Sequence, residues 1–204
     1  MNFDFTKDIL PENERVRLRP IEISDWDNLL PVALADNDLL HYSPSQVHSE
    51  GLLKKYIATA LSDREKEVRY AFSVFDKSAG KYAGSTSFGN IVNKDKRIEI
   101  GWTWIGRQFQ RTGLNRNMKF LMMQYVFETL EFERLEFRTD ERNAASRTAI
   151  EKIGGKYEGT LRSHMLMPDG FRRNTACYSI LKEEWPALKK QLIRTDTSHS
   201  LGIL

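Results

Sequence analysis

The sequence predicts an α+β fold in which a mixed sheet of about seven strands is flanked by helices. A chain of 204 residues with 40% hydrophobic and 29% charged residues has the size and balance of one domain with a substantial core. Between residues 68 and 105, three alternating segments are joined by turn-like sequences, which is typical of an antiparallel meander. A long apolar helical pattern and a hairpin signal near the end complete the order of elements.

The first part of the chain predicts one strand and two helices ahead of the main sheet. Residues 16–21 alternate apolar and polar side chains, and Ser24-Asp25 offers an N-cap for a helix over about 25–35. A second helix is predicted over about 49–66, where apolar residues recur at helical spacing. These residues are Leu52, Leu53, Tyr56, Ile57, Ala60 and Leu61.

Three strands are then predicted over 68–75, 82–91 and 97–105, and the short polar segments between them make an antiparallel meander the simplest connection. Strict alternation along the third strand assigns its side chains to two faces. One face would hold Glu99, Gly101, Thr103 and Ile105, and the other Ile98, Ile100, Trp102 and Trp104.

A long helix over about 113–130 has a wide apolar surface, which implies burial against the sheet and a crossover to a parallel neighbour at about 134–139. Asn143 can cap the next helix, which Gly154-Gly155 would end. The remaining elements are expected in the order hairpin, terminal helix and tail. The hairpin strands are expected near 156–167 and 172–181, on either side of Pro168-Asp169-Gly170, and the terminal helix over 183–193. Residues 1–193 would form a single domain, followed by a polar, frayed tail over 194–204.

Composition excludes several classes of function. The 31 basic and 28 acidic residues are interspersed, and a formal charge of +3 favours a small anionic ligand over a nucleic acid. The single cysteine, Cys177, cannot form an intramolecular disulfide or a cysteine metal cluster, and no metal is expected. No apolar run approaches the ~18 residues of a membrane span, so no membrane association is expected and the predicted compartment is the cytoplasm.

A polar loop precedes the long helix and has the composition of an anion site. A helix N-terminus presents unpaired amide groups and the positive end of the helix dipole, and Gly113 would let a ligand approach the backbone closely. Every helix has such an end, so the loop alone is weak evidence. The loop consists of Gln110, Arg111, Thr112, Gly113, Leu114 and Asn115.

Read together and in order, several segments resemble the GNAT superfamily of N-acetyltransferases, and within it the ribosomal-protein-alanine acetyltransferase (RimJ/RimL-like) subgroup. The resemblance covers about residues 15–190. The segments that bear it are 99–105, 110–115, 143–146, 151–159 and 178–185.

The resemblance implies that acetyl-CoA is the acyl donor and that the 110–115 loop cradles its pyrophosphate through backbone amides. Gln110 and Gly113 match the family pattern, whereas Asn115 stands where Gly or Ala is usual. The backbone of Trp102, Thr103 and Trp104 would pair with the pantetheine arm as an added strand. By the same resemblance Asn143 would contact the pantetheine and Ser146 would lie near the thiol, although both residues also fit a helix start, Asn143 as its N-cap.

Acyl transfer to an amine needs a base for the amine and an acid for the departing thiolate. Glu99 is the candidate base, with a salt-bridged or solvated strand carboxylate as the alternative. Ser146 and Tyr178 are candidates for the acid by their position in the family, and His164 is a further, weaker one. Trp102 and Trp104 are expected to serve core packing rather than substrate binding.

The resulting hypothesis is an enzyme that moves an acetyl group from acetyl-CoA to a primary amine by direct attack in a ternary complex. The subgroup favours a protein N-terminal amine, but the scaffold also serves small amines. Segment 36–51, with His41, Tyr42 and His48, is the expected acceptor wall. The alternatives are a CoA-binding sensor or scaffold without catalysis and, on charge alone, a nucleic-acid binder. A homodimer is compatible with the sequence, which does not determine the oligomeric state.

Overall fold

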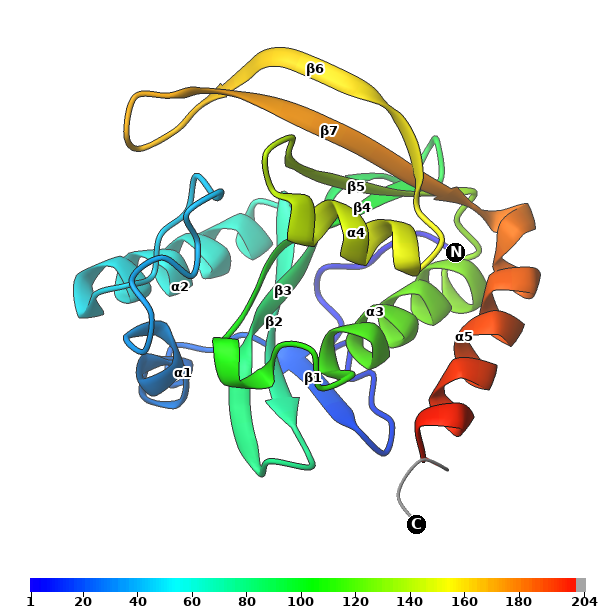
Figure 1. Cartoon of the computed structure of the whole chain (residues 1–204), viewed down its shortest axis with the longest axis horizontal. Helices are drawn as coiled ribbons and strands as arrows, with labels where there is room; N and C mark the ends of the chain where they lie inside the picture. The colour runs from blue at the N-terminus through cyan, green and yellow to red at the C-terminus, as the bar shows by residue number, and fades with distance from the viewer. Residues whose placement is uncertain (201–204) are drawn as a thin grey trace.

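Seven strands form one mixed sheet in the order β1-β2-β3-β4-β5-β7-β6 (Figure 1). The structure is a computed structural model that describes the backbone of residues 1–200 and the side chains of residues 1–193. The strands are β1 (Val16–Pro20), β2 (Arg69–Asp76), β3 (Lys81–Val92), β4 (Arg97–Ile105), β5 (Arg134–Asp140), β6 (Lys156–Leu166) and β7 (Arg172–Leu181). The helices are α1 (Asp25–Ala33), α2 (Glu50–Glu65), η1 (Arg107–Phe109), α3 (Leu114–Gln124), η2 (Tyr125–Thr129), α4 (Ala144–Lys152), η3 (Lys182–Glu184) and α5 (Trp185–Ser200).

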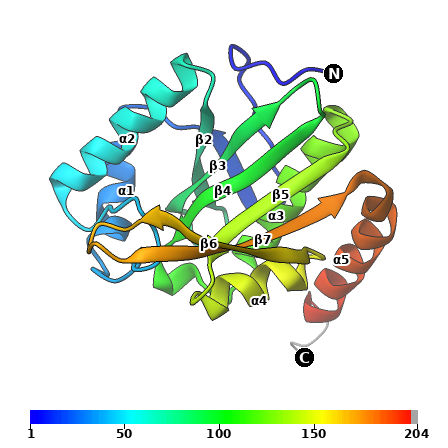
Figure 2. The same ribbon diagram turned by 90° about the horizontal axis from the view of Figure 1, so that it is seen from above.

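The helices lie in two layers, one on each side of the sheet. Figure 2 shows α1 and α2 together on one side, with α3 and α5 across the sheet from them. Helix α2 packs on β2 and α1 packs on β3. On the other side, the ring of Trp185 in α5 stacks on Phe127 at a centroid distance of 5.6 Å, which joins α5 to the end of α3. No helix in the described part of the chain is long and apolar enough to cross a membrane.

The predicted fold class is confirmed, and most elements agree with their predicted bounds within a few residues. The long helix predicted over 113–130 is α3 followed by the π-helical turn η2. Ser24 occupies the N-cap position of α1 but makes no side-chain cap. The adjacent, fully buried Asp25 accepts hydrogen bonds from the Glu22 amide (2.9 Å) and the Ser73 hydroxyl (2.6 Å), and so anchors the start of α1.

The final helix differs from its predicted end. Helix α5 begins at Trp185 and its backbone continues to Ser200, beyond the expected end at 193. The tail predicted over 194–204 therefore includes helical backbone, while its side chains and residues 201–204 lie outside the described part of the structure.

Strands β4 and β5 are parallel but pair over only three positions. Arg97, Ile98 and Glu99 face Arg134, Leu135 and Glu136, in that order. Both strands continue beyond this point, β4 to Ile105 and β5 to Asp140, with no further pairing between them in the described structure. The edge of β4 that faces β5 therefore has no strand partner after Glu99, although side chains bond some of its carbonyls, such as that of Ile105.

A β-bulge interrupts β4 where this free edge begins. Ser87 pairs with Gly101 and Ser85 with Trp104, so one residue on β3 faces two on β4. Trp102 has a positive φ of 49°, which marks it as the bulged residue.

The bulge reverses the alternation of side chains, and the predicted faces of β4 are wrong beyond Gly101. The indole of Trp102 covers Gly89, where an added Cβ would lie 2.4 Å from the ring. Gly89 is directly opposite Glu99 in the β3–β4 ladder, so Trp102 lies on the face of Glu99 rather than with Ile98. Trp104 follows on this face, against Tyr56 of α2, whereas Thr103 points toward α3.

Packing under the bulge involves a buried lysine. Lys119 of α3 is 7% exposed, and its Nζ donates to the hydroxyl groups of Thr103 (2.7 Å) and Thr86 (3.4 Å). Burial lowers the pKa of Lys119 to about 7, although Glu99, on the opposite face of β4, favours the charged form. The interior between α3 and the sheet thus contains an amine that titrates near neutrality.

Gly84 allows β3 to approach β4 closely near the bulge. Its φ is +152°, and a Cβ there would lie 2.0 Å from the Trp104 carbonyl oxygen. We predict that Gly84→Ala lowers the free energy of unfolding by about 3 kcal/mol, from backbone overlap and φ strain, as measured by urea denaturation. Gly51→Ala is the control, because a Cβ there meets nothing within 4 Å. Equal stabilities of the two variants would contradict this packing.

A second prediction concerns Lys119 and pH. Its pKa falls from 10.5 to about 7 on folding, so the unfolded chain binds more protons between these values. The Lys119 contribution to the free energy of unfolding should therefore rise with pH, by up to ~1.4 kcal/mol per pH unit. Urea denaturation of the wild type and Lys119→Met at pH 7, 8 and 9 measures it. A difference between them that does not change with pH would rule out the lowered pKa.

Candidate functional site

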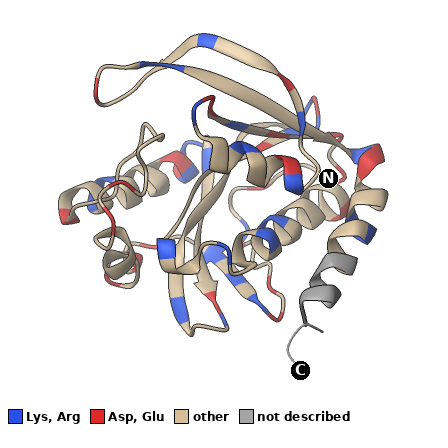
Figure 3. Ribbon diagram, viewed as in Figure 1, with Lys and Arg blue, Asp and Glu red and all other residues tan. Residues whose placement is uncertain are grey.

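The candidate site is the gap between the diverging ends of β4 and β5. The loop that leads into α3 continues directly from the end of β4, and the start of α4 follows the end of β5, with α4 packed on that strand (Figure 1). Basic residues lie around the loop ahead of α3 and along this helix (Figure 3). A chain turn thus follows the end of each diverging strand, and basic residues lie around the first of these turns.

Internal hydrogen bonds shape the predicted anion loop. The Gln110 side-chain amide donates to the Ile105 carbonyl (2.9 Å), and the Thr112 hydroxyl donates to the Phe109 carbonyl (2.7 Å). These bonds tie the loop to the end of β4 before any ligand is present. Gln110, selected as a cradle residue, therefore acts through its side chain as an internal brace in this structure.

The N-terminal end of α3 has the geometry expected of an anion site. Gly113 is the N-cap in the left-handed conformation, with φ 85°, and a Cβ there would meet nothing within 4 Å. The first backbone bond of the helix runs from the Asn117 amide to the Gly113 carbonyl, so the amides of the preceding turn have no acceptor in their own helix. Arg111 is exposed beside them, and buried Leu114 anchors the turn. Such an end attracts phosphate groups.

Asn115 differs from the small residue usual in the family, and the structure shows how it is accommodated. Its Oδ1 is buried and has no hydrogen-bond partner among the described residues. The side-chain oxygen therefore lies inside the protein rather than on the open side of the loop. The backbone amides at the helix end are not blocked by it.

At the start of α4, Asn143 is the N-cap. Its Oδ1 accepts the Ser146 backbone amide at 3.0 Å, which is the alternative role that its position in the sequence suggested. Ser146 is half-buried, and its hydroxyl makes no hydrogen bond within the described residues.

Tyr178 lies on the α4 side of β7 and is 1% exposed. Its hydroxyl accepts from Arg147 Nε (2.9 Å) and donates to Glu151 Oε1 (3.1 Å). Burial raises the pKa of Tyr178, although Arg147 opposes this shift. Tyr178 is thus protonated at neutral pH, and its hydroxyl holds α4 against the sheet.

Glu99 lies on the opposite face of the sheet, which faces α2. It is 6% exposed, and its Oε2 accepts from Asn90 Nδ2 (2.7 Å) and lies 3.4 Å from Arg138 Nε. Burial raises the pKa of Glu99, and the hydrogen bond from Asn90 and the charge of Arg138 oppose the shift. The structure therefore separates the predicted base from Ser146 and Tyr178, with the β4–β5 gap between them.

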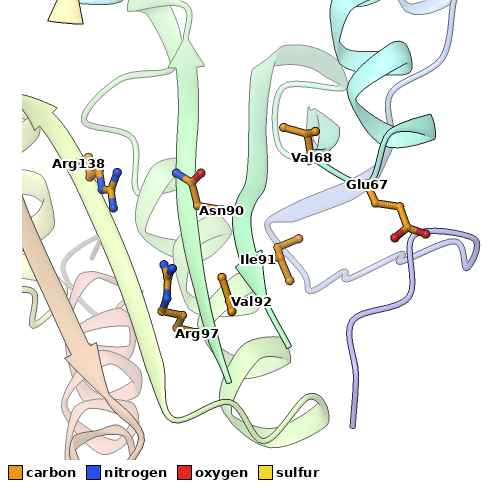
Figure 4. A pocket seen from close by; sticks show the side chains of 7 residues that line it. All are labelled: Glu67, Val68, Asn90, Ile91, Val92, Arg97 and Arg138. Atoms are coloured by element: carbon orange, nitrogen blue, oxygen red, sulfur yellow. The ribbon is translucent and has the colours of Figure 1, made fainter. Parts of the chain in front are cut away.

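An open depression of about 330 Å³ adjoins Glu99 on this face, and two of its lining residues, Asn90 and Arg138, are those that contact the carboxylate (Figure 4). Its other lining residues are Glu67, Val68, Ile91, Val92 and Arg97. A second depression, of about 370 Å³, lies beside the anion loop between Arg15 and Thr112. Within the described residues, no cluster of His, Cys, Asp and Glu side chains could hold a metal ion.

Sequence reasoning missed several charged or polar residues around the site. Asn90 and Arg138 orient Glu99, Arg173 lies on the same face, and Lys119 lies beneath the bulge. The alternation of apolar and charged residues over 134–139 already indicates that Arg138 lies on the same face of its strand as Glu136. For Lys119, the available signal was a lysine within the apolar surface of a helix predicted to be buried.

Comparisons with known proteins agree with this geometry. Residues 15–156 match the family model described as an acetyltransferase (GNAT) domain. YdaF of Bacillus subtilis, provisionally named a ribosomal N-acetyltransferase, is 25% identical over 182 residues, which cover 87% of this chain and 97% of that protein. A GCN5-related N-acetyltransferase from Brucella melitensis superposes with a TM-score of 0.86 at 29% identity, over 92% of this chain and 85% of that one.

A ribosomal-protein-S5-alanine acetyltransferase from Vibrio fischeri shares the fold, with a TM-score of 0.68 at 18% identity, over 87% of this chain and 99% of that one. The diverging parallel strands, the open helix end and the family match are mutually consistent. The chain belongs to the GNAT family and is an acetyltransferase, which confirms the resemblance drawn from its motifs.

Proposed function

We propose that this acetyltransferase moves the acetyl group of acetyl-CoA to a primary amine by direct attack in a ternary complex, with protein N-terminal amines as the acceptor class. The observation on which this rests is the β4–β5 gap. Beyond Glu99 the two strands no longer pair, β4 leads into the open start of α3, and the buried Glu99 carboxylate lies on the opposite face. Donor and acceptor can thus reach one point from opposite faces.

The donor side uses backbone groups. In this proposal the amides at the start of α3, in the loop 110–115, bind the pyrophosphate, and the free edge of β4 at Trp102–Trp104 binds the pantetheine arm. The bulge at Trp102 turns backbone groups of β4 out of the ladder with β3 at this point. Asn143 keeps its Nδ2 for the same arm, because only its Oδ1 is engaged in capping α4.

The acceptor side uses Glu99. The ionised carboxylate takes a proton from the acceptor ammonium, directly or through a water, and the neutral amine attacks the thioester carbonyl carbon. Collapse of the tetrahedral intermediate breaks the C–S bond; the nitrogen loses its extra proton to solvent as the amide forms, and an acid protonates the departing thiolate. Of Ser146 and Tyr178, the acid candidates drawn from the family, Ser146 is the more accessible, whereas Tyr178 would need to exchange its bond to Glu151.

The choice of a protein N-terminus rests on the motifs and on the name of the relative in Bacillus subtilis. The predicted acceptor wall, 36–51, folds toward this face, since the Tyr42 carbonyl accepts a hydrogen bond from Arg173 of β7 at 3.4 Å. Small amines remain the competing acceptors. A panel of N-terminal peptides and small amines, assayed for CoA release from acetyl-CoA, distinguishes the two. Binding of CoA without turnover on any amine would instead support a sensor or scaffold.

The anion loop is tested at Gly113. We predict that CoA raises the melting temperature of the wild type and that Gly113→Glu abolishes this shift, because the carboxylate projects into the open space at the helix end and repels phosphate. Gly113→Ala is the control. It imposes the same strain at φ 85°, about 1 kcal/mol, without the charge, and should keep most of the shift. A full shift in the glutamate variant would exclude this loop as the pyrophosphate site.

Glu99 is tested by Glu99→Gln, which keeps the shape and removes the base. We predict a fall in kcat of about 100-fold or more, with unchanged CoA affinity. Because burial raises the pKa of Glu99 and only the ionised form is a base, wild-type kcat/KM should fall as pH drops through that pKa. This acid limb should be absent in the variant. Asp95→Asn, an exposed change just ahead of the same strand, serves as the control. Wild-type turnover by Glu99→Gln would remove Glu99 from the mechanism.

A further inference from the structure

We infer that the acceptor amine of this enzyme is accompanied by a carboxylate, and that Arg173 binds this carboxylate beside Glu99. This inference rests on the proposed function, because it takes the Glu99 face as the acceptor side. It adds a substrate class, namely amines with an acidic group close to the reacting nitrogen.

Arg173 is a buried cation without a carboxylate partner. Its side chain is 6% exposed, and its Nε donates to the Thr175 hydroxyl (3.1 Å) and its Nη1 to the Tyr42 carbonyl (3.4 Å). Both acceptors are neutral, and no carboxylate of the described residues lies within 4.0 Å of the guanidinium. A buried charge in this state is costly unless a partner compensates it.

Neighbouring arginines on the same face do have their partners. Arg138 contacts the carboxylates of Glu99 and Glu136, and Arg142 bonds both oxygens of Asp140, at 3.0 and 2.7 Å. The local acidic groups are therefore already engaged. Burial lowers the pKa of Arg173; the charges of Asp140 and Glu99 oppose this shift only in part, and neither carboxylate forms an ion pair with it. The uncommitted Nη2 leaves room for an external carboxylate.

The ladder between β5 and β7 places Arg173 on the Glu99 side. Cys177 is directly opposite Arg138, and alternation from Cys177 through Thr175 brings Arg173 to the same face. His164 is exposed to solvent, and its Nδ1 lies 3.0 Å from the Thr175 hydroxyl, which also accepts from Arg173. A proton acceptor and a guanidinium without a carboxylate partner thus lie on the same face of the sheet, near enough to interact electrostatically. This pairing matches an ammonium and a carboxylate in one molecule.

Two sources can supply this carboxylate. One is the α-carboxylate of a free amino acid. The other is an acidic side chain at the first or second position of a peptide N-terminus. In both cases the guanidinium can bind two carboxylate oxygens in its plane, a contact that a lysine cannot reproduce.

Matched acceptors test the inference. The first pair consists of tetrapeptides that begin Ser-Asp or Ser-Asn, and it tests an acidic against a neutral peptide. The second pair consists of free aspartate and its diamide, and it tests the small-molecule source. We predict that the wild type prefers the acidic member of at least one pair, and that Arg173→Met raises KM for that acceptor by about 10-fold or more while kcat changes little. Arg173→Lys should recover only part of the loss. Arg172→Gln, an exposed change at the next residue, is the control.

The melting temperature distinguishes binding of a substrate carboxylate by Arg173 from a purely structural role of this residue. Because Arg173 has no ion-pair partner in the described residues, Arg173→Met should leave the melting temperature unchanged or raise it. Equal kcat/KM for both members of both pairs in the wild type would overturn the inference, as would a retained acidic preference in Arg173→Met.

If the proposed function is wrong, the results differ: CoA raises the melting temperature, but no amine is acetylated. In that case calorimetric titration of the same acceptors into the CoA-bound protein decides the inference by itself. Binding of an acidic acceptor that is lost in Arg173→Met supports it, and the absence of such binding refutes it.

Discussion

The early separation of β4 from β5 is the constraint on which the rest of the structure depends. The two strands pair only as far as Glu99 and Glu136, and the bulge at Trp102 then redirects β4. Parallel strands in a sheet interior ordinarily satisfy each other's backbone groups, so a free edge at this depth must be satisfied otherwise. In the proposed function, the pantetheine arm of the donor is the partner that adds to this edge.

Aromatic packing holds the bulge in place. Trp102 lies over Gly89, where no side chain fits, and the guanidinium of Arg69 lies 5.5 Å from its ring centre. On the other face of β4, Thr103 is hydrogen-bonded to Lys119 and to Thr86. The strand is therefore fixed from both sides at the point where it leaves its neighbour, which gives the free edge a defined geometry before substrate arrives.

The same geometry distributes the chemistry over two faces. The start of α3, the proposed phosphate site, lies on one side of the sheet, and the carboxylates of Glu99, Glu136 and Asp140 lie on the other. On the second side, Arg138 and Arg142 pair with these three carboxylates, and Arg173 has no carboxylate partner among the described residues. Tyr178, by contrast, is committed to Arg147 and Glu151, so its position in the sequence overstates its freedom to transfer a proton.

The sequence by itself determined what depends on local pattern. Hydrophobic periodicity predicted the order of strands and helices, and the polar loop ahead of an apolar helix suggested the proposed anion site at Gly113. Glu99 was found because it lies on the strand that leads into that loop. These features follow from neighbours in the chain, and a linear pattern records them.

Only the tertiary structure decided the features that depend on distant partners. The bulge leaves no trace in a strand with apolar residues at both Trp102 and Trp104, because either register buries an aromatic ring. The separation of Glu99 from Ser146 onto opposite faces depends on the strand order β4-β5-β7, which joins segments far apart in sequence. The unpaired charge of Arg173 emerges only when all carboxylates around it are placed, since an ion pair is a property of three-dimensional distance and burial.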